Sequence, residues 1–215
     1  MKRYDIYARA HKALRALFAD TMVAVARADL AEDCEAREAQ ARLEELLAFC
    51  EMHARLENEF IHRALDERRP DASCSFAREH AQQEAAMAQL RDAAARRDPA
   101  LHRQLAVFVA NNLLHMEDEE TRGNDLLREA FSDEEIRAIE RRLVASKPPA
   151  DSMETLRWML PAMNHPERVE MLRGMQGAPQ AVFEGALAVA RANLGARDVK
   201  RLEEALGLVP VAKVA

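Results

Sequence analysis

The chain has few of the residues that interrupt helices or build disulfide frameworks. Its 215 residues include only 6 glycines, 8 prolines and 3 cysteines, and aromatic side chains make up 5%. The odd number of cysteines and the lack of a CxxC pair argue against a disulfide scaffold and against a zinc ribbon. Alanine, leucine, glutamate and arginine are abundant instead, and all four are good helix formers. The composition therefore predicts a mostly helical globular protein.

Blocks of one charge sign and long apolar runs are also missing. The chain carries 31 basic and 37 acidic residues, a net charge of -6, and the two signs are interspersed. Because no basic block would follow a phosphate backbone, we expect no nucleic-acid partner. No run approaches the roughly 18 apolar residues of a membrane span, and residues 1–20 are charged throughout, unlike a signal peptide. We therefore expect a cytoplasmic protein with reduced thiols and no membrane partner.

Apolar residues recur with helical spacing over the first part of the chain. Proline and polar residues interrupt the pattern near Asp33–Glu38, at Pro70 and at Pro99. Short connections favour antiparallel neighbours, so we predict an all-α fold with an up-down-up-down four-helix bundle over residues 1–130. The four long helices are predicted at about 3–29, 37–68, 75–96 and 99–128.

Residues 131–215 have a different organisation. Ser132–Glu135 has the pattern of a capping box and begins a helix that we expect to end near residue 146, before Lys147-Pro148-Pro149. Shorter helices should follow, at about 152–163, after Pro166, after Pro179 and at about 197–206. We predict a helical extension that serves homodimerisation or partner contact, and we find no catalytic residues in it.

Histidine and glutamate occupy the faces of the predicted helices that should be buried. The second and fourth helices contain HARLE and HMEDE, in which a histidine precedes a glutamate by four residues on the apolar stripe. The first and third helices each add one histidine to their own apolar stripe. In chain order these residues are His11, His53 with Glu57, His80, and His115 with Glu119.

Buried carboxylates need partners, and the spacing supplies them. Burying an ionised carboxylate is unfavourable unless it is paired or bound to a metal. Residues four apart on a helix lie about 40° apart, so a histidine and a glutamate can serve one compact site. Four imidazoles and two carboxylates would suit two metal ions about 3.5–4 Å apart, each carboxylate bridging both. A metal-free network of histidine–glutamate ion pairs is the alternative.

The order H, HxxxE, H, HxxxE on four successive helices resembles the hemerythrin-like family, also called the HHE cation-binding family. The resemblance covers about residues 5–125. It implies a non-haem centre of two iron ions that binds or senses dioxygen, nitric oxide or peroxide, with both glutamates bridging. Imidazole and carboxylate ligands also suit manganese and zinc. The implied ligands are His11, His53, Glu57, His80, His115 and Glu119.

Three further residues are candidates for an extra ligand or for an outer partner of a ligand. Glu84 stands four residues after His80, where oxygen-carrying hemerythrins have a second histidine on the third helix. Tyr7 and Asn112 each precede a predicted histidine ligand by one turn. If Glu84 does not coordinate, each ion would keep an open position, which favours reaction with small molecules over protected reversible carriage.

Other interpretations use the same residues. A ferritin-like carboxylate site would need two ExxH motifs, and only Glu59 to His62 fits. An α-helix would also turn His62 about 180° away from His53. A metal-storage protein would have to bind far more than two ions, which six ligands do not support. A helical interaction scaffold without metal remains the third alternative.

Overall fold

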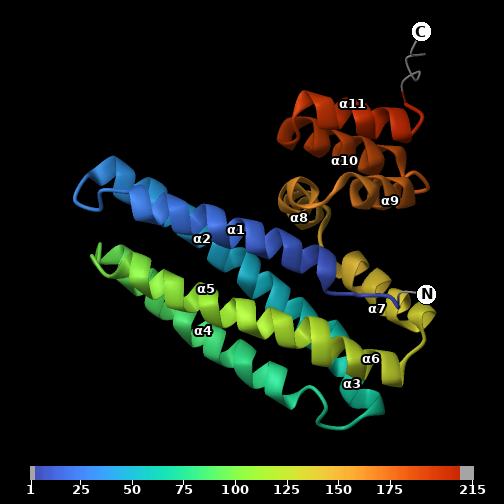
Figure 1. The fold of residues 1–215 in the computed structure, drawn as a ribbon, viewed down its shortest axis with the longest axis horizontal. Helices are drawn as coiled ribbons and strands as arrows, with labels where there is room; N and C mark the ends of the chain where they lie inside the picture. The colour runs from blue at the N-terminus through green and yellow to red at the C-terminus, as the bar shows by residue number, and fades with distance from the viewer. Residues whose placement is uncertain (1–2, 209–215) are drawn as a thin grey trace. The chain divides into compact units, whose positions relative to one another are not determined.

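The computed structural model describes residues 3–208, apart from the side chains of residues 149 and 150 (Figure 1). Over this range the chain forms helices and no strands, which confirms the predicted all-α class. It divides into two compact units, Met1–Ser146 and Lys147–Ala215, which are described separately. No helix between residues 3 and 208 combines the length and the apolar character that crossing a lipid bilayer requires. Cys34, Cys50 and Cys74 are all free thiols.

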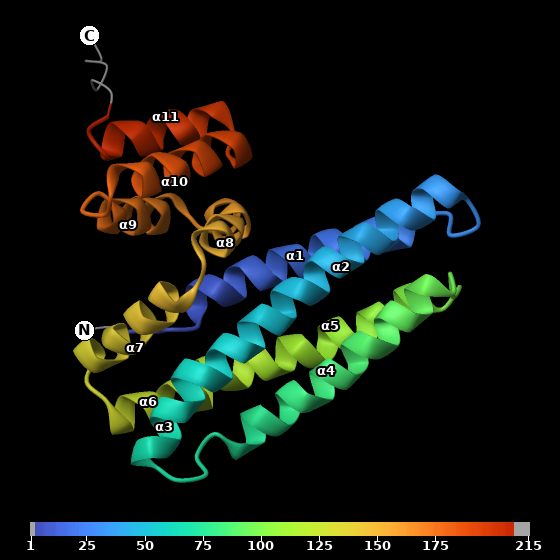
Figure 2. The same ribbon diagram turned by 180° about the vertical axis from the view of Figure 1, so that it is seen from behind.

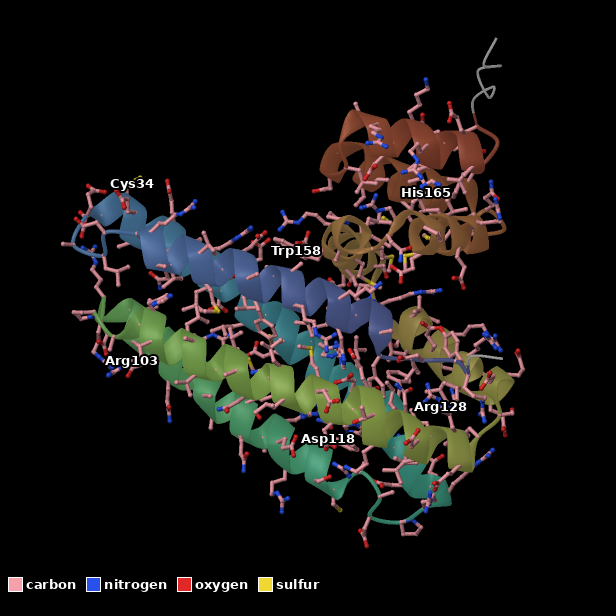
Figure 3. All side chains as sticks on the ribbon, in the orientation of Figure 1. Cys34, Arg103, Asp118, Arg128, Trp158 and His165 are labelled. Carbon is pink, nitrogen blue, oxygen red and sulfur yellow. The ribbon has the colours of Figure 1, made fainter. Side chains whose placement is uncertain are left out.

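Four long helices dominate the first unit. Consecutive long helices run in opposite directions, as the two views in Figures 1 and 2 show. Each packs against two others: α1 and α4 both contact α2 and α5. Side chains fill the space between them (Figure 3). The helices are α1 (Ala8–Arg27), α2 (Asp33–Leu56), α4 (Cys74–Ala95) and α5 (Leu101–Asp118).

Side-chain caps set where the first two helices begin. The Asp5 carboxylate accepts from the backbone N–H groups of Tyr7 and Ala8, both at 3.1 Å, so α1 starts later than the predicted residue 3. The Glu32 carboxylate accepts from the N–H groups of Cys34 and Glu35, so α2 starts earlier than the predicted residue 37. Both caps satisfy donors that a helix N-terminus leaves without intrahelical partners.

Two of the long helices continue through π-helical segments. At the end of each segment, a backbone N–H donates to the carbonyl five residues earlier, from Arg63 to Asn58 and from Asn124 to Glu119. Such a segment holds an extra residue, so the side chains that follow are rotated relative to a continuous α-helix. The elements are η1 (Glu57–His62) leading to α3 (Arg63–Arg68), and η2 (Glu119–Gly123) leading to α6 (Asn124–Ala130).

Helix α7 (Asp133–Ser146) completes the first unit. The predicted capping box is present, because the Ser132 N–H donates to Glu135 and the Glu135 N–H donates to the Ser132 hydroxyl. Ile136 and Ile139 are buried against η1 and α3 side chains. The chain therefore divides after Ser146, whereas the boundary predicted from the sequence fell after residue 130.

The second unit consists of four shorter helices, in agreement with the helices predicted there. A capping box between Asn164 and Glu167 begins one of them. Buried leucines form their common core, among them Leu160, Leu172 and Leu202. A role in dimerisation or partner contact stays a prediction. The helices are α8 (Pro149–Ala162), α9 (His165–Met175), α10 (Gln180–Asn193) and α11 (Ala196–Ala205).

Candidate metal centre

Two glutamates lie in the interior of the first unit. Glu57 is 2% exposed and Glu119 is fully buried. Each is the first residue of a π-helical segment, directly after α2 or α5. An ionised carboxylate in such a position needs cations or donors around it. The surroundings of these two side chains therefore define the site.

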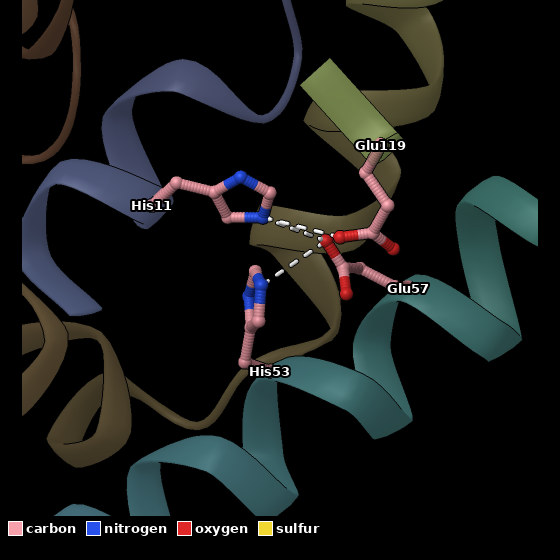
Figure 4. Close-up of side chains that lie close together, drawn as sticks. All are labelled: His11, His53, Glu57 and Glu119. Carbon is pink, nitrogen blue, oxygen red and sulfur yellow. Dashed lines mark ion pairs between the residues drawn. The ribbon is translucent and has the colours of Figure 1, made fainter. Parts of the chain in front are cut away.

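His11 and His53 lie on one side of the two carboxylates (Figure 4). The Nε2 atom of His11 is 3.5 Å from Glu57 Oε1 and 3.4 Å from Glu119 Oε2. The Nε2 atom of His53 is 3.1 Å from Glu57 Oε1. Helix α1 thus contributes one imidazole to this side, and α2 contributes a second one with its glutamate.

His80 and His115 lie on the other side. His80 Nε2 is 3.4 Å from Glu57 Oε2, and His115 Nε2 is 3.3 Å from Glu119 Oε1. The two Nε2 atoms are 2.9 Å apart. Each carboxylate therefore presents one oxygen to each pair of histidines. The structure brings the six ligands predicted from the sequence into one cluster, in the order needed for two bridging carboxylates.

The outer nitrogens of three rings have hydrogen-bond partners that fix their orientation. His11 Nδ1 lies 2.9 Å from Glu120 Oε1, and His115 Nδ1 lies 2.7 Å from Glu79 Oε2. His80 Nδ1 lies 3.0 Å from the side-chain oxygen of Asn58.

An acceptor at each of these Nδ1 atoms keeps a ring proton there and makes Nε2 the nitrogen that faces the glutamates. Metal-ligating histidines in proteins are held in this way. The sequence did not predict the roles of Asn58, Glu79 and Glu120, because polar residues at solvent-accessible helix positions have no distinctive periodic signal.

A fifth histidine, His62, joins the cluster. It is 3% exposed, and its Nε2 atom lies 3.6 Å from Glu119 Oε1. The sequence-based expectation that His62 points away from His53 was wrong, because it assumed a continuous α-helix. The π-helical segment η1 turns the ring inward. His62 follows Glu57 by five residues, the spacing of a π-helical hydrogen bond, and this spacing could have indicated that His62 faces inward.

The remaining three candidates have different positions. Tyr7 is buried, and its ring stacks on His11 with centroids 5.4 Å apart. Asn112 is buried, but its amide donates to the Phe108 carbonyl at 2.8 Å and so bonds within its own helix.

Glu84 is exposed, and the clusters of metal-ligating groups in the described part of the chain do not include it. The structure therefore leaves the candidate Glu84 outside the cluster. The inward stripe of α4 runs from His80 towards Met87, which leaves Glu84 on the solvent side.

Opposite charges balance one another inside the cluster. Burial disfavours the ionised form of Glu57, but His53 and His11 hold the pKa of this carboxyl well below its usual range. Burial lowers the pKa of His11, but Glu119, Glu120 and Glu57 more than reverse this and raise it well above the usual value. Without a metal, protons on the imidazoles therefore balance the carboxylates.

The donor atoms also fit metal ions. Two donors that each lie about 2.1 Å from one ion, at an angle of 90–110°, are separated by about 3.0–3.4 Å. The imidazole–carboxylate distances run from 3.1 Å for His53 to 3.7 Å for His80, close to this range.

Buried atoms without a hydrogen-bond partner gather at the same place, and they include the Nε2 atoms of His11, His53 and His62 and both oxygens of each glutamate. Two groups there could each hold an ion, one with His11 and His53 and the other with His80 and His115, and they share Glu57 and Glu119.

Comparisons of the chain with protein-family models, with curated proteins and with solved structures found no match. What the site can do therefore follows from its own residues.

Proposed function

We propose that this chain is a non-haem protein with two iron ions, of the hemerythrin-like kind, that binds or senses dioxygen, nitric oxide or peroxide. In this proposal α1, α2, α4 and α5 form the up-down-up-down bundle of that family, and the second unit is its extension. One observation carries the proposal: two buried carboxylates each offer one oxygen to a pair of imidazoles on either side. A purely structural core has no need of this arrangement.

Each residue of the cluster has a part in the proposal. His11 and His53 would hold one ion, His80 and His115 the other, and Glu57 and Glu119 would bridge them. Iron supplies the redox reactivity towards small molecules that amino-acid side chains lack. The ligands are all nitrogen and oxygen donors, a set that iron shares with manganese and zinc.

The burial of the cluster supports a small ligand. The oxygens of Glu57 and Glu119 are inaccessible to solvent. A surface cavity of about 470 Å³ between α4 and α5 is lined by Glu79, Asn112 and His115, so it reaches the outer side of one predicted ligand. In this proposal a diatomic molecule or peroxide enters from this cavity, and a larger substrate does not fit beside the buried carboxylates.

Iron loading tests the proposal. We expect protein loaded with iron in air to contain two ions per chain and to show near-ultraviolet charge-transfer bands that azide or nitric oxide perturbs. The double variant Glu57→Ala/Glu119→Ala should lose both the iron and the bands. Protein that takes up zinc alone, or no metal, would overturn the proposal.

Two alternatives predict other results in the same experiment. A storage protein would take up iron far in excess of two ions per chain. A metal-free scaffold would bind no iron, and its double variant would be as stable as the wild type or more stable, because buried ion pairs are often replaceable by apolar residues.

A further inference from the structure

We infer that His62 is an additional protein ligand of the metal centre and completes the group formed by His80 and His115. This inference rests on the proposed function, since it assigns one more donor to the same two ions. It makes the centre unequal, with two imidazoles on the side of His11 and His53 and three on the other side.

The His62 nitrogen lies outside the two groups whose donor atoms are all within 4.8 Å of one another, but it shares one carboxylate oxygen with two predicted ligands. The His62 Nε2 atom lies 3.6 Å from Glu119 Oε1. The same oxygen lies 3.3 Å from His115 Nε2 and 3.7 Å from His80 Nε2. Three imidazole nitrogens thus surround one carboxylate oxygen, and His62 is no farther from it than His80 is.

The ring is held in place for this role. His62 Nδ1 lies 2.9 Å from the side-chain oxygen of Asn58, which also accepts from His80 Nδ1. The ring stacks on Phe76 and on His80, with centroids 5.5 Å and 5.3 Å apart. Asn58 thereby orients two rings together, so that both direct Nε2 towards the glutamates.

A hydrogen bond does not account for the inner nitrogen. His62 Nε2 is buried, and Glu119 Oε1 lies 3.6 Å away, which is ion-pair distance but longer than a normal hydrogen bond. Leaving a buried polar atom unpaired costs about 1–3 kcal/mol, and a core histidine normally avoids this by bonding through both nitrogens. Coordination of a metal ion would satisfy the atom.

The two halves of the centre differ at this position. His62 follows Glu57 by five residues across η1, and Asn124 follows Glu119 by five residues across η2. The Asn124 amide nitrogen donates to the Glu120 carbonyl, and its side-chain oxygen is buried without a hydrogen-bond partner. Only the first half therefore offers an imidazole there, and the side of His11 and His53 keeps one imidazole fewer.

Cobalt(II) provides the probe, because it accepts nitrogen and oxygen ligands, absorbs visible light and shifts the proton signals of coordinated histidines. The variant His62→Phe keeps a ring in the stack and removes both nitrogens. His62→Gln is a second, smaller replacement in case the phenyl ring disturbs the core. His102→Gln is the matched control, since His102 is exposed on α5. Circular dichroism of the metal-free proteins shows whether each variant is folded.

We expect wild type and His102→Gln to bind two Co(II) ions per chain. In both His62 variants one of the two ions should bind at least about tenfold more weakly. The visible spectrum should change as well, and His62→Phe should lose one of the shifted exchangeable proton signals.

Two outcomes would overturn the inference in distinguishable ways. If wild type binds two ions and the His62 variants keep the same affinities, spectrum and shifted signals, His62 is not a ligand and the proposed function stands. If wild type binds neither cobalt nor iron, the proposed function fails, and the assignment of His62 fails with it.

Discussion

Glu120 controls the outer side of His11, and replacing it gives a quantitative test of the centre. Its Oε1 atom lies 2.9 Å from His11 Nδ1 and accepts from an Arg15 guanidinium nitrogen at 2.6 Å. Burial raises the pKa of Glu120, but the hydrogen bonds from His11 and Arg15 outweigh this effect and lower the pKa to about 2. The ionised carboxylate keeps the His11 proton on Nδ1 and leaves Nε2 to face Glu57 and Glu119.

We expect Glu120→Ala to weaken metal binding by about 10- to 100-fold, the usual effect of losing the outer partner of a ligating histidine. This corresponds to about 1.4–2.7 kcal/mol of binding free energy. Glu120→Gln keeps an oxygen that can accept from Nδ1 and loses only the charge. Because the Glu120 side chain is 25% exposed, solvent screens that charge, and the glutamine variant should lose less affinity than the alanine variant.

The assay is competition with a chelator for Co(II), and thermal unfolding of the metal-free proteins shows that each variant is folded. Glu117→Gln is the matched control, because Glu117 is exposed on the same helix and its replacement removes the same charge. Equal affinities for wild type and Glu120→Ala would refute the role of the hydrogen bond. A loss in Glu117→Gln as large as that in Glu120→Gln would indicate a general charge effect instead.

Three further predictions concern stability. Burial lowers the pKa of His115, but Glu119 and Glu79 raise it to about 9. Metal-free protein should therefore lose about 3 kcal/mol of its free energy of unfolding as the pH rises from 6.5 through 9. Urea unfolding that shows constant or rising stability over this range contradicts the prediction. Phe76 is fully buried beside His62, and its replacement by alanine should lower the free energy of unfolding by about 3–5 kcal/mol. Urea unfolding with chelator present measures this loss. Free metal at 100 times its dissociation constant should stabilise wild type by about 2.7 kcal/mol for each bound ion, and it should leave the melting temperature of Glu57→Ala/Glu119→Ala unchanged.

The sequence was sufficient for the parts of the molecule that depend on helical periodicity. The long helices and the inward positions of His11 and His80 follow from apolar residues recurring every three or four positions. The HxxxE spacing places His53 with Glu57 by the same geometry. Helix ends were less predictable, because side chains such as Asp5 and Glu32 decide them through two local hydrogen bonds each.

The parts that were missed depend on contacts between segments far apart in sequence. Glu79 on α4 contacts His115 on α5, and Glu120 contacts His11, which lies more than a hundred residues away in the sequence. Neither glutamate differs in local pattern from the other acidic residues on exposed helix faces. Glu84 was proposed from a family pattern, and the actual direction of the α4 stripe turned it towards solvent.

The π-helical segments explain how one helix can direct three donors at the same centre. In a continuous α-helix, residues nine apart lie about 180° apart, so His53 and His62 could not share a face. The bond from the Arg63 N–H to the Asn58 carbonyl accommodates an extra residue, and the inward face continues from Glu57 to His62. A second such segment begins at Glu119, although ENEFIH and EETRG share only their first residue. Local sequence preference therefore does not explain the repetition, whereas the geometry required around two buried carboxylates does.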